Sequence, residues 1–416
     1  MPEGSRIADA GLADAGGAHI AWAEGQMPVL GLIGKRFAAE RPLDGLRVAA
    51  CLHVTAETAC LIRTLRAGGA EASLCSANPL SAQDDVAAAL AAEGADVHAA
   101  RGEDMETYAS HVATVIDARP NVTLDDGADL LSFAHAADRL DGVIGGTEET
   151  STGILRLRRL EREGELRCPV LAVNEALSER TLNDRYGTGQ SALDGILRAA
   201  NLLLAGNTLV LFGYGYAGRG IAQRARGAGA AVVICEVDPL RALEARMEGY
   251  EVMPSLDAAQ RGDLFITVTG SRNVLRREHF ERMKDGAVLA NAGHFDVEID
   301  LDALRAAADG PPRAVLPLVE RYEVAGRRLH LLASGRVVNL AAGEGHPAAV
   351  MDISFALQAL AAEHLARNGD KLESRVLDVP RGLDEEVARL KLAAFGVKVD
   401  EPTEEQLDYR QSWLPG

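Results

Sequence analysis

The sequence predicts an α/β protein built from two parallel-sheet domains, and three observations support this prediction. Apolar segments alternate with helix-like segments from Leu46 to Ala200, and a second alternating series begins at Asn207. Such alternation is typical of βαβ units and a parallel sheet. In addition, a length of 416 residues exceeds what one hydrophobic core usually supports.

Each series places its strands and helices in turn. In the first we expect strands in RVAACLH (47–53), AEASLCS (70–76) and ADVHAA (95–100), and helices in TAETACLIRTLRAGG (55–69) and AQDDVAAALAAEG (82–94). In the second we expect strands in NTLVLFGYG (207–215), AAVVICEVD (230–238), DLFITVTG (263–270) and AVLANAG (287–293), and a helix in GRGIAQRARGAG (218–229). A long helix in VMDISFALQALAAEHLARNG (350–369) then precedes a charged C-terminal tail.

Charge and composition exclude several classes of protein. The 43 basic and 61 acidic residues give a net charge of −18, which repels nucleic acid and anionic lipid headgroups. No apolar run approaches the roughly 18 residues that span a bilayer, and the N-terminal segment does not read as a secretion signal. The five cysteines lack metal-binding spacings. We therefore expect a cytoplasmic protein with buried thiols, no metal site, and neither nucleic acid nor a membrane as partner.

A glycine-rich motif predicts a dinucleotide site. Gly213, Gly215 and Gly218 follow an apolar strand and open a helix, which is the context that a GxGxxG motif requires. These glycines let the backbone approach a pyrophosphate at the positive end of the helix. Glu236 ends the next strand, where its carboxylate can bind both ribose hydroxyls and repel a 2′-phosphate. Arg219 and Arg241 lie nearby, yet Glu236 favours NAD over NADP.

Eight motifs that occur in order indicate a family. They are CLHVTAET, NPLSAQDD, DDGADL, EETSTG, NDRYGTGQS, GYGYAGRG, NAGHFDVEID and VNLAAGEGHP. Together they resemble adenosylhomocysteinase, from about Pro42 to the C-terminal tail, and an ordered set is more specific than any single motif. The resemblance implies a substrate domain at 1–186 completed by 347–386, a Rossmann NAD-binding domain at 187–346, and a tail at 387–416.

The resemblance also implies a reaction. Hydride passes from the ribose 3′ carbon to tightly bound NAD, the ketone acidifies the 4′ hydrogen, and a group is eliminated from the 5′ carbon. In the hydrolase, water then adds to the alkene and the hydride returns, so that the cofactor is recycled in each turnover. A small-molecule adenine nucleoside is the implied substrate, and a homo-oligomer, either tetramer or dimer, is the implied assembly.

Site residues follow from the same resemblance. His53 and Asp126 match an acid–base pair near the 4′ and 5′ carbons, and His294 matches a residue beside them; imidazole and carboxylate suit proton transfer near neutral pH. The implied substrate contacts are Thr55 and Glu57 for adenine, Glu149 for a ribose hydroxyl, Asp184, and His346 and Met351 over the base. The implied NAD contacts, beyond those named above, are Thr150, Ser151, Thr152, Tyr216, Ala217, Arg241, Thr269, Asn291, Gly293 and Asn339.

The chain departs from the family where the 3′-hydroxyl would bind. Family members carry a lysine and, four residues later, an aspartate before the YG pair. Counting without gaps, these positions hold Glu179 and Asn183, with Asp184 next. A one-residue shift would instead select Arg180 and Asp184, although arginine is a poor base. Glu179 could act as base or acid if burial raises its pKa. The tail also lacks the family's extension that reaches a neighbour's NAD.

Three functions are compatible with this pattern. The altered pair favours a nucleoside dehydratase that stops after elimination, resembling adenosylhomocysteinase-like enzymes of nucleoside-antibiotic pathways such as that of angustmycin. The alternatives are a genuine adenosylhomocysteinase, which releases homocysteine, and a non-catalytic NAD-binding regulator. A 2-hydroxy-acid dehydrogenase ranks last, because it would not explain HVTAET or EETSTG.

Overall fold

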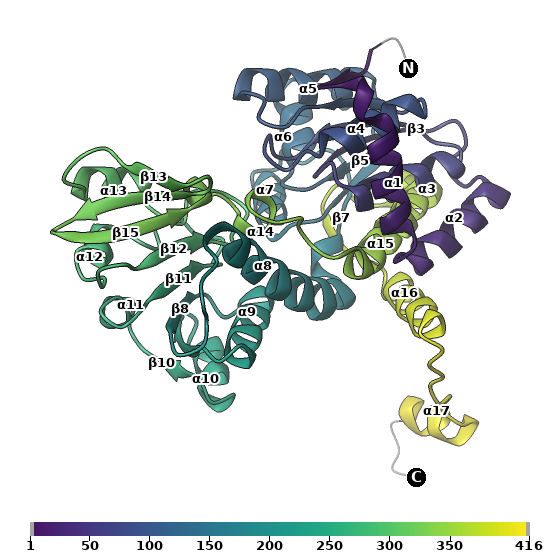
Figure 1. Ribbon diagram of the computed structural model, residues 1–416. Coiled ribbons are helices and arrows are strands. Elements are labelled where there is room, and N and C mark those ends of the chain that lie inside the picture. Colours follow the sequence, from purple (N-terminus) through teal and green to yellow (C-terminus); the bar gives the residue numbers. More distant parts are fainter. Residues whose placement is uncertain (1–3, 413–416) are drawn as a thin grey trace.

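The computed structural model describes residues 4–412, which form two lobes, each built around an eight-stranded sheet (Figure 1). All strands of the first sheet are parallel, in the order β1-β4-β3-β2-β5-β6-β7-β16. Their bounds are β1 (Arg6–Ile7), β2 (Arg47–Leu52), β3 (Glu71–Ser76), β4 (Asp96–Ala99), β5 (Val122–Asp125), β6 (Gly145–Glu148), β7 (Val170–Ala172) and β16 (Val376–Asp378). Because helices cover both faces, strands such as β2 are apolar almost throughout.

Helices form a layer on each side of the first sheet. One layer contains α1 (Ala13–Glu24), α2 (Pro28–Glu40), α3 (Ala56–Ala67), α4 (Asp84–Ala92) and the long α15 (Ala348–Asn368). The other contains α5 (Met105–Asp117), α6 (Asp129–Ala136) and α7 (Ser151–Arg162). Short turns of helix lie at η1 (Ala10–Leu12), η2 (Val173–Glu175) and η5 (Gly369–Lys371). The sequence analysis missed α1 and α2, although Val29, Ile33 and Phe37 of α2 are buried at helical spacing.

The second lobe has a mixed sheet in the order β10-β9-β8-β11-β12-β15-β14-β13. Its strands are β8 (Thr208–Phe212), β9 (Ala231–Cys235), β10 (Glu251–Val252), β11 (Leu264–Thr267), β12 (Val288–Asn291), β13 (Arg313–Leu316), β14 (Val319–Val324) and β15 (Arg327–Leu332). Its helices are α8 (Gly189–Ala200), α9 (Tyr216–Gly227), α10 (Pro239–Met247), α11 (Ser255–Ala258), α12 (Arg277–Phe280), α13 (Leu301–Ala307), η4 (Ala333–Gly335) and α14 (Val338–Ala341). Strands β13 to β15 are joined by antiparallel pairing. The predicted fold class, two parallel-dominated α/β sheets with a Rossmann domain, is confirmed.

The chain passes between the lobes through one long helical run. A π-helical segment, η3 (Glu179–Thr188), continues directly into α8, so the predicted boundary between residues 186 and 187 falls inside this run. The chain returns to the first lobe through α15 and β16; the predicted domain bounds stay a prediction. The predicted tail at 387–416 differs from the structure at its start, because Val387 and Lys391 belong to α16 (Arg381–Ala394) and are buried against the first lobe.

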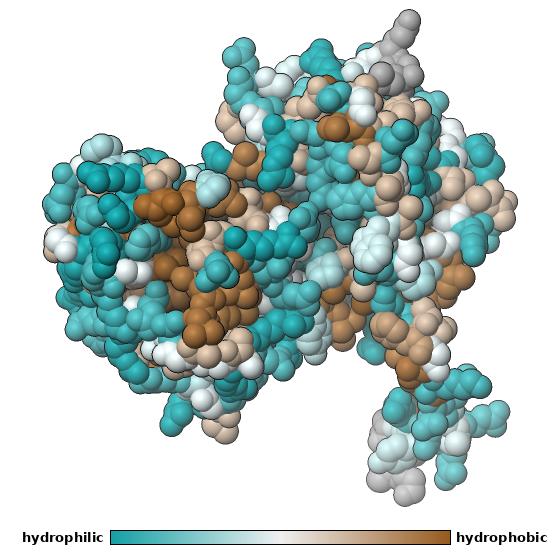
Figure 2. All heavy atoms as spheres, in the orientation of Figure 1, coloured by the Kyte–Doolittle hydropathy of each residue, from teal (hydrophilic) through white to brown (hydrophobic). Residues whose placement is uncertain are grey.

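Beyond α16 the chain extends away from both lobes and ends in α17 (Glu404–Gln411), which stands apart in Figure 1; residues 413–416 of the predicted tail lie outside the described part. Apolar side chains also gather on the second lobe beside its junction with the first (Figure 2). Exposed patches of this kind mark interaction surfaces. The homo-oligomer nevertheless stays a prediction.

Two further expectations can be compared with the structure. All five cysteines are buried and unpaired, as predicted. No helix among residues 4–412 combines the length and apolar content needed to cross a bilayer.

A buried ion pair joins α16 to the first lobe and predicts a large effect on stability. Asp352 is fully buried, accepts the backbone N–H of Leu30 at 2.8 Å, and pairs with Lys391 Nζ at 2.7 Å. Asp352→Ala leaves the buried ammonium without its carboxylate partner, so we expect a loss of about 3–5 kcal/mol in the free energy of unfolding, measured by urea denaturation. The exposed pair of Arg381 and Glu385 supplies the control, since Glu385→Gln should cost less than about 1 kcal/mol. Equal losses in the two variants would contradict the prediction.

Candidate active site

The carboxyl ends of both sheets point to one cavity between the lobes, with a volume of about 520 Å³. His53 follows β2, Asp126 follows β5, and Glu149 follows β6. From the other lobe, Thr269 lies just beyond β11 and Gly293 just beyond β12. Ligand sites in parallel α/β sheets form at these strand ends. The cavity is therefore the candidate active site.

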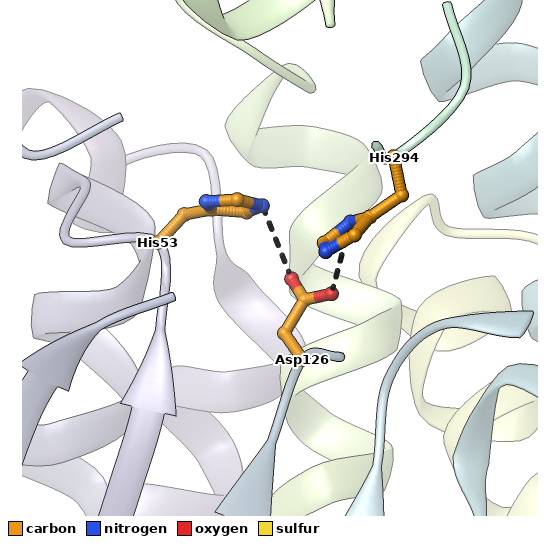
Figure 3. A group of neighbouring side chains, drawn as sticks. All are labelled: His53, Asp126 and His294. Carbon is orange, nitrogen blue, oxygen red and sulfur yellow. Dashed lines mark ion pairs between the residues drawn. The ribbon is translucent and has the colours of Figure 1, made fainter. Parts of the chain in front are cut away.

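His53, Asp126 and His294 meet across the junction of the lobes (Figure 3). His53 Nε2 lies 3.4 Å from Asp126 Oδ2, and His294 Nδ1 lies 3.9 Å from Asp126 Oδ1. Burial lowers the pKa of His53. The nearest nitrogen and oxygen atoms of the three side chains lie within 4.8 Å of one another, close enough for a metal ion to bridge them, although no metal was expected. As proton-transfer groups, the two imidazoles flank one carboxylate that lines the cavity.

Two buried carboxyl groups, Glu149 and Glu179, interact where the chain departs from the family's lysine–aspartate pattern. Glu149 accepts hydrogen bonds from Ser354 Oγ and from Gln358 Nε2, the latter at 2.5 Å, and burial raises its pKa to about 8. Burial, followed by the charge of Glu149, also raises the pKa of Glu179 well above its ordinary value. Glu179 Oε1 is buried without a hydrogen-bond partner among the described residues. The pair therefore holds a proton at neutral pH that a solvated carboxylate would not.

Asn183 connects Glu179 to His346, which lines the cavity. Its amide nitrogen donates to Glu179 Oε2 at 2.6 Å, and its Oδ1 accepts from His346 Nδ1 at 2.6 Å. Thr188 Oγ1 lies 3.1 Å from His346 Nε2, which makes the hydroxyl the donor to a neutral ring. Burial lowers the pKa of His346 to about 4, which agrees with a neutral ring. Glu179 and Asn183 thus act as one hydrogen-bonded unit despite the π-helical backbone.

The alternative alignment, shifted by one residue, selects Arg180 and Asp184, and these two residues do not contact each other in the same way. Arg180 pairs with Glu175 at 3.0 Å, whereas Asp184 lines the cavity, and burial raises the pKa of Asp184 to about 7. Both Arg180 and Asp184 reach the cavity, while Glu179 lies behind its wall. Glu179 and Asn183, the pair that the gap-free count selected, contact each other directly through their side chains.

The end of the cavity beside α3 has the groups expected to hold a base. Thr55 begins α3 and accepts the N–H of Thr58 at 3.4 Å, and Glu57 lies in the first turn of that helix. Burial raises the pKa of Glu57. Met351 and His346 line the same cavity from the segment around the start of α15. The arrangement offers one carboxyl group and an apolar wall to a flat ring.

The opposite end fits a dinucleotide. Gly213 has a φ of 97°, and a Cβ added at Gly218 would lie 2.2 Å from the Gly213 carbonyl oxygen, so both positions require glycine. Gly215 precedes α9, whose N-terminus opens to the cavity. Thr152 Oγ1 and Asn339 Oδ1 are buried in the described structure without hydrogen-bond partners, although both residues line the cavity. These polar atoms are available to a bound carboxamide or ribose.

Most predicted site residues meet in this cavity. All line it except Glu179, Gly213, Glu236 and Asn291. Glu236 accepts the Tyr214 N–H at 2.7 Å and thereby braces the glycine-rich turn. The sequence analysis did not assign several other lining residues, namely Leu52, Thr58, Asn174, Thr188, Val268, Gly270, Ala292, Val337, Leu340, Glu344, Gly345 and Phe355. Most of them lie in or next to the quoted motifs, and this proximity is the sequence feature that could have identified them.

The surroundings of Glu236 predict selectivity for NAD. Arg219 pairs with Glu244, and Arg241 lies 3.7 Å from Asp238, so each guanidinium already has a carboxylate partner. Glu236→Ser should weaken NAD binding about tenfold or more, because a hydrogen bond to a charged group is lost. Calorimetric titration of nucleotide-free protein with NAD and NADP tests this, with Asp257→Asn as the control. Unchanged NAD affinity in Glu236→Ser would refute the assignment.

Comparisons with known proteins agree over the whole chain. Residues 4–142 match the family model "S-adenosyl-L-homocysteine hydrolase", and residues 184–345 match "S-adenosyl-L-homocysteine hydrolase, NAD binding domain". The chain is 55% identical to an adenosylhomocysteinase of Aquifex aeolicus, and the match covers 99% of each chain. It is 52% identical to an adenosylhomocysteinase of Saccharolobus solfataricus, again over 99% of each chain. It is also 52% identical to an S-inosyl-L-homocysteine hydrolase of Methanopyrus kandleri, over 99% of this chain and 97% of that one.

Proposed function

Because this chain belongs to the adenosylhomocysteinase family of NAD-dependent enzymes, we propose that it hydrolyses a nucleosidyl-homocysteine thioether by transient oxidation at the ribose 3′ carbon. The observation that carries the proposal is one cavity lined by the His53–Asp126–His294 cluster, by Glu149 and by the dinucleotide end, with Glu179 buried behind Glu149. Relatives over 50% identical and named adenosylhomocysteinase favour the hydrolase over a dehydratase.

The carboxyl pair is suited to the first step. When bound, NAD supplies the acceptor for the 3′ hydride and later its donor. Glu149 lines the cavity and can accept the 3′-hydroxyl proton, while Glu179 keeps a proton that the pair shares. Burial of both groups raises their basicity, so that a carboxylate here is a stronger base than a solvated one. The pair thereby takes over the role of the missing lysine.

The second step uses the other cluster. The ketone acidifies the 4′ hydrogen, and Asp126 or one of the imidazoles beside it takes that proton. His53 then gives a proton to the group that leaves the 5′ carbon and later takes one from the water that adds there. Burial of the cluster keeps other water away from the intermediate alkene.

A second candidate function, nucleoside dehydratase, is favoured by one specific observation. The lysine ammonium of the family is replaced by Glu179, a buried carboxyl group whose pKa is raised. A neutral carboxylic acid can protonate a leaving hydroxyl group so that it departs as water. A thiolate is a better leaving group and needs such protonation less. The non-catalytic regulator has no such observation in its favour, because His53, Asp126 and His294 all line the cavity.

One experiment separates the two candidates. The purified protein is incubated anaerobically with S-adenosyl-L-homocysteine and, separately, with adenine nucleosides that carry a free 5′-hydroxyl. Release of a free thiol supports the hydrolase. A product lighter than the nucleoside by one water, without thiol release from the thioether, overturns it in favour of the dehydratase.

A double variant and a substrate with a second nucleobase extend this test. Glu179→Lys with Asn183→Asp restores the family pair, and a gain of thiol release over the wild type would show that this pair separates the two activities. Because one relative is an S-inosyl-L-homocysteine hydrolase, the nucleobase of the substrate is also tested, with S-inosyl-L-homocysteine as the second thioether. Glu57 in its charged form accepts from the adenine amine and in its neutral form can donate to a carbonyl. We expect adenine to be preferred.

A further inference from the structure

One motif quoted above, NPLSAQDD at 78–85, contributes no group to the cavity, yet it contacts a catalytic histidine. Ser81 lies in the loop between β3 and α4, and it is only 4% exposed. Its hydroxyl oxygen lies 2.6 Å from His53 Nδ1 and 2.9 Å from the Asn78 carbonyl oxygen. Ser81 therefore sits behind His53, on the side opposite to Asp126.

The two contacts define how the hydroxyl is used. A carbonyl oxygen can only accept, and a serine hydroxyl has one hydrogen. If that hydrogen goes to the Asn78 carbonyl, the Ser81 oxygen must accept from Nδ1–H of His53. Neutral His53 then carries its hydrogen on Nδ1 and presents the Nε2 lone pair toward Asp126, 3.4 Å away.

We propose that Ser81 is a positioning residue that keeps Nδ1 of His53 protonated and so makes Nε2 the atom that exchanges a proton with the substrate. Nδ1 carries its hydrogen in both the neutral and the charged ring, so the hydrogen bond to Ser81 persists in both states. His53 can then gain and lose a proton at Nε2 without rearrangement. The inference rests on the proposed function only for the identity of the substrate.

The groups that face His53 define its pH dependence. Asp126 favours the charged ring, whereas His294 and His346 disfavour it, and burial disfavours it most. His294 lies on the second lobe with its ring centroid 6.0 Å from that of His53. Loss of the Ser81 acceptor removes a group that stabilises imidazolium. Ser81→Ala should therefore move the acidic limb of the pH profile of kcat, which follows His53, to lower pH.

The test compares Ser81→Ala with Ser81→Thr, which keeps the hydroxyl, in the full-length protein loaded with NAD. We expect Ser81→Ala to lower kcat about 10- to 100-fold with little change in KM, and Ser81→Thr to recover most of the loss. Nitrogen-15 NMR of labelled histidine, with the signals of His53 assigned through His53→Gln, should show Nδ1–H in the wild type and a shift toward Nε2–H in Ser81→Ala.

The outcomes separate this inference from the proposed function. An Nε2–H ring in the wild type, or identical spectra and pH profiles in wild type and Ser81→Ala, would overturn the role of Ser81. Failure of every variant and of the wild type to turn over any nucleoside would instead overturn the proposed function, and the NMR result would still decide the role of Ser81.

Discussion

Glu179→Gln is expected to lower the rate of nucleoside oxidation by about 100- to 10,000-fold, the range for loss of a positioned acid–base group. Glutamine keeps the size of the side chain and can keep the contact with Asn183, which is 2.6 Å long in the wild type. It cannot share a proton with Glu149, so Glu149, which takes the 3′-hydroxyl proton, loses its proton-sharing partner. Single-turnover absorbance of the reduced nicotinamide measures this step.

The neighbouring arginine supplies a matched control for this prediction. Arg180 lines the cavity and pairs with Glu175 at its surface, with 38% of its side chain exposed. Arg180→Gln should change the oxidation rate less than about tenfold, because an exposed ion pair contributes little. A larger loss in Arg180→Gln than in Glu179→Gln would transfer the role to the Arg180–Asp184 register.

The pH dependence of oxidation adds a second readout. A carboxyl group with a raised pKa is protonated below that pKa and becomes a base above it. Since the pKa of Glu149 is raised to about 8, the oxidation rate of the wild type should increase as the pH rises toward that value. Oxidation that is constant across this range would contradict the assignment of a carboxyl base.

The elements of the fold that repeat a pattern could be predicted from the sequence. Strands such as β2 and β8 have buried apolar runs, and the helices between them carry apolar residues at regular spacing. The hairpin β14–β15 was missed because its two-residue turn, Ala325–Gly326, has positive φ values of 49° and 73° without the usual asparagine. The π-helical segment η3 also has no simple pattern in the sequence.

The candidate site divides in the same way. His53, Asp126 and Glu149 were predicted from the family resemblance, and the structure shows that each follows a parallel strand and lines the same cavity. The sequence could not show that Ser81 meets His53 or that Asn183 meets His346, because these contacts join segments that are separated along the chain. Burial of Glu179, on which its raised pKa depends, is a property of the folded structure that the sequence does not show.

Asp126→Asn is expected to leave oxidation largely intact and to block the steps that follow it. Asparagine occupies the same volume and can still accept a hydrogen bond from either imidazole, but it cannot take the 4′ proton. Turnover should fall by about 100- to 10,000-fold. The absorbance of the reduced nicotinamide should persist after substrate is added, and exchange of the 4′ hydrogen with deuterated water should be slow.

This pattern would be opposite to that of Glu179→Gln, and the contrast separates the two clusters. Asp129→Asn is the control, because Asp129 lies three residues away and pairs with Arg156 at 2.6 Å outside the cavity; it should retain turnover. If Asp126→Asn exchanged the 4′ hydrogen at the wild-type rate, the proton would have to be taken by another group. His294, with Nδ1 3.9 Å from the carboxylate, is then the base to test, because it lines the same cavity as Asp126.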